Sequence, residues 1–156
     1  MKGIFEEGIF LKNKQVIVTG GMGFIGSHLT ERLLENNEVT VIDNESTGKI
    51  ENIKHLLNHE SLTVIKGSIV DLNLIEIFKE KDYIFHLAAI PSVPRSVKDP
   101  FGSNSSNVTG TLNVLIAAKD AGVKKVIFSS RFCISTSNMC LLFRKKNTRN
   151  KRDLDE

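Results

Sequence analysis

The sequence predicts a doubly wound α/β domain, in which helices cover both faces of a parallel sheet. Three observations indicate this fold class. Short apolar runs rich in β-branched residues alternate with segments of helical periodicity, a glycine-rich turn joins the first run to the first helix, and 156 residues suffice for one domain with a hydrophobic core. Hydrophobic residues make up 40% of the chain and charged residues 25%, as in globular domains.

Five apolar runs are expected to form buried strands. They occupy residues 15–20, 38–43, 62–67, 83–89 and 125–130. Helical spacing of apolar residues marks the connections between them, which are residues 24–35, 49–57, 72–80 and 106–122. Gly122 suits the position after the end of the last helix. We expect the strand order 3-2-1-4-5.

The edge of the fifth strand is expected to be open, because the pattern of strands and helices stops after Ser130. Exposed parallel edges and uncovered apolar faces favour aggregation. The alternative is that "MCLLF" (139–143) folds back over this edge as a substitute strand or helix.

The stretch "VTGGMGFIGSHL" (18–29) carries the strongest functional signal. Gly21, Gly23 and Gly26 satisfy the spacing G-x-G-x-x-G, and Gly20, Gly23 and Gly26 satisfy the related G-x-x-G-x-x-G. Glycine is needed where a chain turns tightly, where backbone approaches a diphosphate, and where a helix packs closely on a strand. The N-terminus of the following helix would direct N–H groups at the phosphates.

Asp43, at the end of the second predicted strand, completes a dinucleotide-binding pattern. It stands about 20 residues beyond the glycines, where a carboxylate accepts hydrogen bonds from the adenosine ribose. A carboxylate there would also repel a 2′-phosphate, and "DNESTGK" (43–49) contains no arginine and a single cation, Lys49. We therefore expect NAD rather than NADP as the cofactor. The alternative is an aspartate that only caps a turn.

Four motifs together resemble a known superfamily. They are "VTGGMGFIGSHL", "VIDNESTG", "HLAAIPSVPRSVKDP" and "NVTGTLNVLIAAKDAGVKKVIFSS". In order and spacing they are similar to the extended short-chain dehydrogenases/reductases. Within these they resemble NAD-dependent nucleotide-sugar epimerases and dehydratases, above all UDP-glucose and UDP-N-acetylglucosamine 4-epimerases. The resemblance implies an N-terminal extension over residues 1–14, an NAD-binding Rossmann domain over 15–130 and a basic, disordered tail unrelated to the family over 131–156.

The resemblance also implies roles for individual positions. Phe24 and Ile25 would meet the diphosphate through backbone N–H groups, and Asn107 would contact the cofactor region. The implied cofactor-binding residues are Gly20, Gly23, Phe24, Ile25, Gly26, Asp43, Asn44, Ser46, Thr47, Gly48, Ser68, Ile69, Leu87, Ala88, Ala89, Ile90 and Asn107. Ser92 would touch a sugar nucleotide, the substrate class of the intact family. Ser68 departs from the aspartate that many members carry.

The residues that perform the family's chemistry are missing from this sequence. In the family, NAD takes a hydride from the sugar and returns it, with a tyrosine base in Y-x-x-x-K and a Ser or Thr beside it. Tyr83 is the only tyrosine, and Leu87 stands four positions later. Arg131 occupies the position of the Ser or Thr, and we expect the substrate domain to be absent. We expect no catalytic residue here, and interpret the abrupt change at Arg131 as a frameshift, a truncated gene or a chimeric junction.

The positive charge belongs to the end of the chain. Residues 144–156 hold six Lys or Arg and three Asp or Glu, which accounts for the whole net charge of +3. We expect a solvated tail that binds no nucleic acid, because no aromatic residues are interleaved with its cations. His55 and His59 lack a third ligand, so no metal site is expected. No apolar run reaches the roughly 20 residues of a membrane span, and we expect a cytoplasmic protein.

Four functions fit these observations. The chain is the NAD-binding portion of a nucleotide-sugar 4-epimerase that cannot catalyse alone, or a non-catalytic NAD-binding regulatory module. A third hypothesis is one half of a split epimerase, complemented by a second chain that carries Y-x-x-x-K. The fourth is an interaction protein with a basic tail, in which the Rossmann core is only structural.

Overall fold

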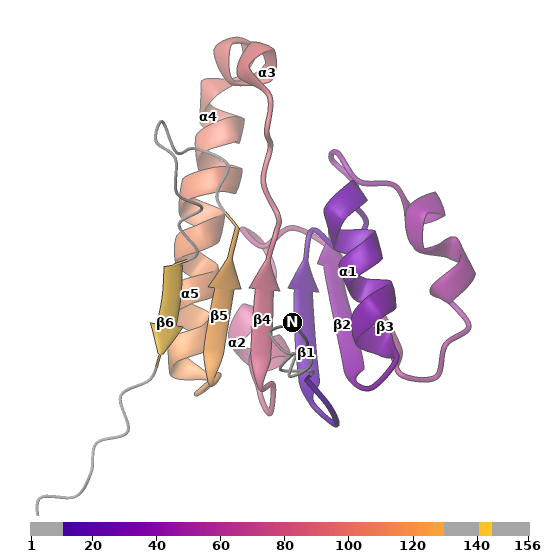
Figure 1. Ribbon diagram of the computed structural model, residues 1–156. Helices are drawn as coiled ribbons and strands as arrows, with labels where there is room; N and C mark the ends of the chain where they lie inside the picture. Colours follow the sequence, from indigo (N-terminus) through magenta and orange to yellow (C-terminus); the bar gives the residue numbers. More distant parts are fainter. Residues whose placement is uncertain (1–10, 130–140, 145–156) are drawn as a thin grey trace, which may run out of the picture.

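The parallel sheet that the sequence predicts is present, with one more strand than expected. The computed structural model describes residues 11–129 and the backbone of residues 141–144. Its sheet has the order β3-β2-β1-β4-β5-β6, and the first five strands pair in parallel (Figure 1). The strands are β1 (Gln15–Thr19), β2 (Glu38–Asp43), β3 (Leu62–Lys66), β4 (Tyr83–His86), β5 (Lys125–Phe128) and β6 (Leu141–Arg144). The predicted order 3-2-1-4-5 is confirmed.

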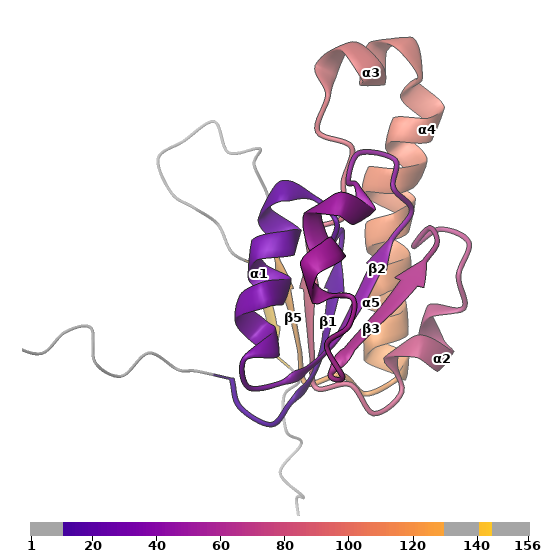
Figure 2. The same ribbon diagram turned by 90° about the vertical axis from the view of Figure 1, so that its right-hand side faces the viewer.

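Helices cover both faces of this sheet. They are α1 (Phe24–Leu34), the 3₁₀-helix η1 (Ile50–Leu56), α2 (Leu74–Phe78), α3 (Val93–Lys98), α4 (Pro100–Asn104), the π-helical turn η2 (Ser105–Thr109) and α5 (Gly110–Asp120). Seen along the sheet, α1 and η1 lie on one side, and α2 and α5 lie on the other (Figure 2). The domain is therefore doubly wound, as predicted.

The core consists of two hydrophobic clusters, one on each face of the sheet, because successive strand side chains point to opposite faces. Ile17 and Ile42 pack with residues of α2 and α5, whereas Val16, Val18 and Val41 pack with residues of α1 and η1. All five side chains are fully buried. Burial of each aliphatic side chain contributes about 1.5–3 kcal/mol, so the central strands form a rigid support for the loops at their ends.

Two helical connections differ from their prediction. Residues 49–57 form a 3₁₀-helix instead of an α-helix. The helix predicted over 106–122 is the end of a longer helical column, which begins at Pro100 and contains the π-helical turn. Asp99 caps the start of this column, since its side chain accepts a hydrogen bond from the backbone N–H of Gly102 at 2.9 Å. Gly122 follows the column with a φ of +76°, as predicted for a glycine at this position.

The prediction of an open edge at β5 is wrong. Residues 141–144 form β6, which pairs with β5 in antiparallel register from Lys125↔Arg144 to Phe128↔Leu141. The unpaired N–H and C=O groups of an edge strand favour such an addition, and the short segment downstream is long enough to return along β5. The fold-back of 139–143 was the alternative, and its residues 141–143 do form a strand. The predicted tail beyond residue 144 lies outside the described residues.

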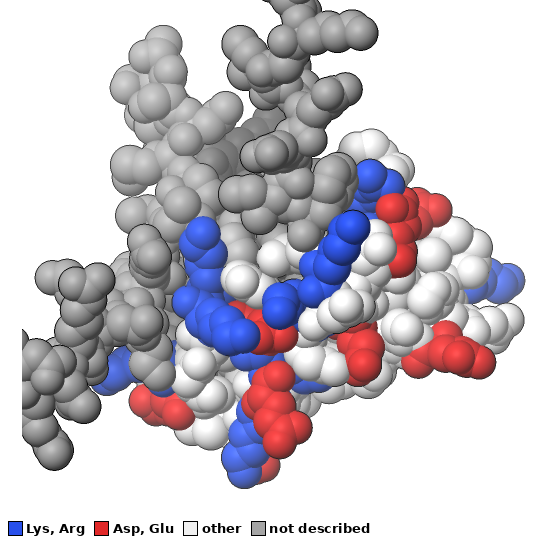
Figure 3. Space-filling model, turned by 60° about the horizontal axis from the view of Figure 1, so that its bottom comes forward, with Lys and Arg blue, Asp and Glu red and all other residues white. Residues whose placement is uncertain are grey.

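Among the described residues, the charged side chains seen at the amino ends of the strands form no patch of one sign. Acidic and basic residues are interspersed there (Figure 3). At this end of the sheet, Asp82 and Lys124 form an ion pair. Asp82 also accepts a hydrogen bond from the backbone N–H of Gln15 at 3.0 Å. Within the part of the chain that the structure describes, no helix is long and apolar enough to cross a membrane.

Candidate functional site

The glycine-rich turn forms a tight cradle between β1 and α1. Gly20 has a φ of +73°, and its N–H donates to the carbonyl of Ile42 on the neighbouring strand at 2.8 Å. A Cβ on Gly26 would lie 2.1 Å from the carbonyl oxygen of Gly20, so only glycine fits there. α1 then begins at Phe24 without a side-chain cap on Gly23. The N–H groups of its first turn therefore remain available to a ligand.

Asp43 joins the second strand to this cradle. Its Oδ2 accepts the backbone N–H of Met22 at 2.9 Å, and its Oδ1 accepts the N–H of Glu45 at 2.8 Å. The side chain is buried, with 8% of its surface exposed. Each carboxylate oxygen has a further lone pair, so Asp43 can support the turn and still accept hydrogen bonds from a ribose. The alternative of a capping aspartate is thus compatible with a role in binding.

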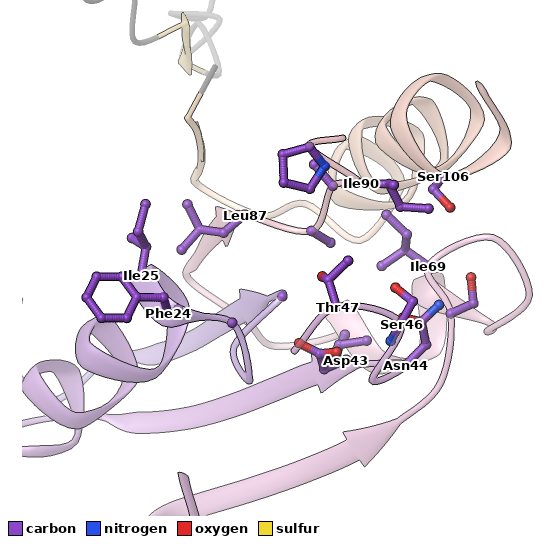
Figure 4. Close-up of a pocket in the computed structure, with 18 of the residues that line it drawn as sticks. Phe24, Ile25, Asp43, Asn44, Ser46, Thr47, Ile69, Leu87, Ile90 and Ser106 are labelled. Carbon is purple, nitrogen blue, oxygen red and sulfur yellow. The ribbon is translucent and has the colours of Figure 1, made fainter. Parts of the chain in front are cut away.

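A pocket of about 460 Å³ lies at the carboxyl ends of β1, β2 and β4. In open α/β sheets, this end of the strands is where ligands bind. Phe24 and Ile25 project from the start of α1, and Ser46 and Thr47 lie across the pocket from Ile90 (Figure 4). Of the predicted cofactor-binding residues, all but Gly48 and Asn107 line the pocket. The residues lining it that were not predicted are Ile42, Gly67, Pro91, Ser106 and Ser129.

The three predicted residues that do not line the pocket have other contacts. Gly48 packs against the glycine turn, where an added Cβ would lie 2.7 Å from the carbonyl carbon of Met22. Asn107 makes two hydrogen bonds to the backbone of Ile90 in the pocket wall. Its Oδ1 accepts the N–H of Ile90 at 2.7 Å, and its Nδ2 donates to the Ile90 carbonyl at 3.2 Å. Ser92 caps α3, since its Oγ accepts the N–H of Arg95 at 3.3 Å. Their binding roles stay predictions.

His86 sits behind the pocket wall and is buried. Its Nδ1 lies 2.7 Å from the Thr19 hydroxyl, and its Nε2 lies 2.9 Å from the Thr111 hydroxyl. The ring stacks on Phe128 with 5.6 Å between centroids. Burial lowers the pKa of His86 from 6.5 to about 4. The imidazole is therefore neutral at pH 7 and links β1, β4 and α5 beneath the pocket.

These features fit a dinucleotide. The glycine turn lacks side chains, so it and the N–H groups of the first turn of α1 can accommodate a diphosphate. Asp43 can accept hydrogen bonds from the ribose beside it. Apolar groups such as Ile69 suit a flat base. Two of the five lining residues that sequence reasoning missed, Gly67 and Ser129, directly follow β3 and β5. The rule that ligands bind at the carboxyl ends of parallel strands would have identified them.

His55 and His59 each have a polar contact within the protein. The imidazole Nε2 of His55 lies 3.5 Å from a carboxylate oxygen of Glu31 on α1, and Nδ1 of His59 accepts the N–H of Ser61. Among the described residues, no group of three or more His, Cys, Asp or Glu side chains is arranged to hold a metal ion.

Comparison with protein families identifies one match over most of the chain. The family model described as GDP-mannose 4,6 dehydratase matches residues 17–140. This match starts within β1. We expected the family resemblance to stop at Ser130, but the match continues for ten residues beyond it. It includes the glycine turn, Asp43 and the whole wall of the pocket from Leu87 to Ile90.

Individual relatives agree with this match. UDP-glucuronic acid decarboxylase 1 of Danio rerio is 39% identical over 118 residues, which cover 75% of this chain and 27% of the relative. The UDP-N-acetylglucosamine 4-epimerase of Methanobrevibacter ruminantium M1, solved with UDP-N-acetylmuramic acid, has a TM-score of 0.74 and 52% identity. That match covers 77% of this chain and 38% of the other.

A third relative bears on the cofactor. DesIV, a dTDP-glucose 4,6-dehydratase of Streptomyces venezuelae solved with NAD and TYD bound, has a TM-score of 0.68 and 35% identity, over 72% of this chain and 38% of its own. The expectation of an NAD-binding family is thereby confirmed. The chain spans between about a quarter and two fifths of the length of these relatives.

Proposed function

Because the chain belongs to the GDP-mannose 4,6 dehydratase family of nucleotide-sugar epimerases and dehydratases, we propose that its pocket binds NAD. One observation carries the proposal: the backbone N–H of Met22, in the glycine turn, donates to Asp43 at 2.9 Å. This contact holds the carboxylate beside the first turn of α1, so that a ribose and a diphosphate can be bound together. NAD, which has no 2′-phosphate, suits the buried negative charge.

We further propose that residues 15–130 are the NAD-binding portion of a nucleotide-sugar 4-epimerase that acts on a UDP-sugar. The identity of 52% to a UDP-N-acetylglucosamine 4-epimerase supports this choice within the family. On this proposal the 156 residues bind the cofactor but do not turn over the sugar. Their single tyrosine, Tyr83, begins a strand and has Leu87, not lysine, four positions later. The tyrosine–lysine pair must then come from outside this sequence.

Calorimetric titration of the full chain with NAD tests the binding proposal. We expect saturable binding, weaker binding of NADP, and about tenfold weaker binding of NAD by Asp43→Asn, because the neutral amide keeps only one acceptor oxygen. Asp120→Asn, at the exposed end of α5, is the matched control and should bind as the wild type does. Absence of saturable NAD binding by the folded wild-type chain would refute the proposal.

The 4-epimerase proposal has its own test. The full chain with NAD and UDP-N-acetylglucosamine should produce no C4 epimer, whereas addition of a polypeptide that carries Y-x-x-x-K on a matching substrate domain should restore turnover. Sequencing of the transcript across codon 131 tests the origin of the change at Arg131. A downstream frame that encodes Y-x-x-x-K would support a frame break, and its absence in all three frames would contradict one.

A further inference from the structure

Arg95 reaches from one wall of the pocket to the other. It belongs to α3, a short helix with no buried residue, which follows the wall segment 87–91. Its Nη1 donates to the backbone carbonyl of Ser46 at 3.3 Å. Ser46 lies 49 residues earlier in the chain, in the loop after β2, and lines the pocket. The guanidinium therefore spans the outer rim of the pocket.

The loop that carries Ser46 rests on the glycine turn. A Cβ added to Gly48 would lie 2.7 Å from the carbonyl carbon of Met22 and 2.9 Å from the nitrogen of Gly23, and the N–H of Lys49 donates to the Met22 carbonyl at 3.1 Å. These contacts tie the loop that carries Ser46 to the cradle, at which a diphosphate would lie. Ser46 itself lies farther along this loop, beside Asn44 and Ile69 (Figure 4).

Among the described residues, the lining of the pocket supplies no cationic side chain, and Asp43 is the only charged residue in it. A diphosphate brings two negative charges into this surrounding, and the first turn of α1 offers only the partial charges of its N–H groups. Lys66, near the end of β3, is already paired with Glu45, whose pKa this lysine lowers.

We propose that Arg95 binds the diphosphate of the dinucleotide, and that the Ser46 carbonyl positions its guanidinium for this task. The proposal rests on the proposed function. A guanidinium presents several N–H donors in one plane, so it can donate to Ser46 and to phosphate oxygens together. The resulting contact would join α3 to the loop after β2 over the bound dinucleotide. Sequence reasoning assigned no role to Arg95, because the position lies far from the glycine and aspartate motifs.

Calorimetry on the full chain with Arg95→Gln tests this role, and Lys98→Gln, on the same short helix, is the matched control. Both variants remove one exposed positive charge, but only Arg95 contacts the pocket lining. We expect about tenfold weaker NAD binding by Arg95→Gln, partial recovery in Arg95→Lys and no change in Lys98→Gln. Salt should weaken NAD binding less in Arg95→Gln than in the wild type.

Two further probes separate the possible failures. Adenosine, which has no phosphate, should bind Arg95→Gln and wild type alike when followed by NMR, and an equal loss for adenosine and NAD would show that Arg95 only supports the loop. An effect on UDP-N-acetylglucosamine without one on NAD would assign the guanidinium to a different diphosphate. Unchanged NAD binding by Arg95→Gln would overturn this inference alone, whereas no NAD binding by the wild type would overturn the proposed function as well.

Discussion

Acidification should destabilise this domain through one buried imidazole, that of His86. The side chain is 1% exposed, and its hydrogen-bonding and stacking partners Thr19, Thr111 and Phe128 are all neutral. Burial lowers the pKa of His86 from 6.5 to about 4 in the folded chain. The unfolded chain therefore binds the proton more readily than the folded chain does. The stability due to the neutral imidazole is fully present above about pH 6.5 and is lost as the pH falls towards 4.

The size of the effect follows from the two pKa values. Between pH 7 and pH 4.5, protonation of His86 in the unfolded chain lowers the free energy of unfolding by about 2.5 kcal/mol. That is a large part of the 5–15 kcal/mol typical of a domain, on the order of half in the least stable cases. Carboxylates with lowered pKa values, such as Asp82 beside Lys124, add a smaller loss at the acid end of this range.

Urea unfolding of the full chain at pH 7.0, 5.5 and 4.5 measures the loss, and His86→Gln isolates the contribution of the imidazole. Glutamine keeps an acceptor and donors for the two hydroxyls but does not titrate. We expect the variant to be less stable than wild type at pH 7 and to lose about 2.5 kcal/mol less between pH 7 and 4.5. Parallel losses in both proteins would refute the assignment to His86.

Three substitutions test the packing in and around α1. Gly26→Ala should abolish NAD binding and lower stability by about 2 kcal/mol or more, because its Cβ would lie 2.1 Å from the Gly20 carbonyl oxygen. Gly23→Ala, with 3.3 Å to the same oxygen, is the milder control, and equal effects in melting and titration would contradict the steric explanation. Thr30→Val should raise the free energy of unfolding by about 1 kcal/mol, because the buried Thr30 hydroxyl has no hydrogen-bond partner among the described residues. A lower urea midpoint for this variant would show that the hydroxyl is bound in the native protein.

Much of the site was predictable because its signals are local. The glycine turn needs residues without Cβ atoms at set intervals, and Asp43 must follow a strand that pairs with β1. Short stretches of sequence meet both requirements, so the spacing of these residues alone predicts that the glycine turn and the Asp43 carboxylate lie side by side. Helices α3 and α4 lie outside the predicted helices, since no periodic apolar pattern distinguishes five or six mostly exposed residues from a loop.

Local patterns in the sequence predict the doubly wound sheet, its order from β3 to β5, and the position of Asp43 beside the glycine turn. Hydrophobic periodicity and glycine spacing act over a few residues, so they can be read from the sequence. Residues far apart in the sequence meet only through tertiary packing: β6 pairs with β5, Asn107 bonds to Ile90, His86 lies between two threonines, and Arg95 donates to Ser46. Those contacts depend on how the packed helices and loops align over the sheet, and no local pattern encodes that alignment.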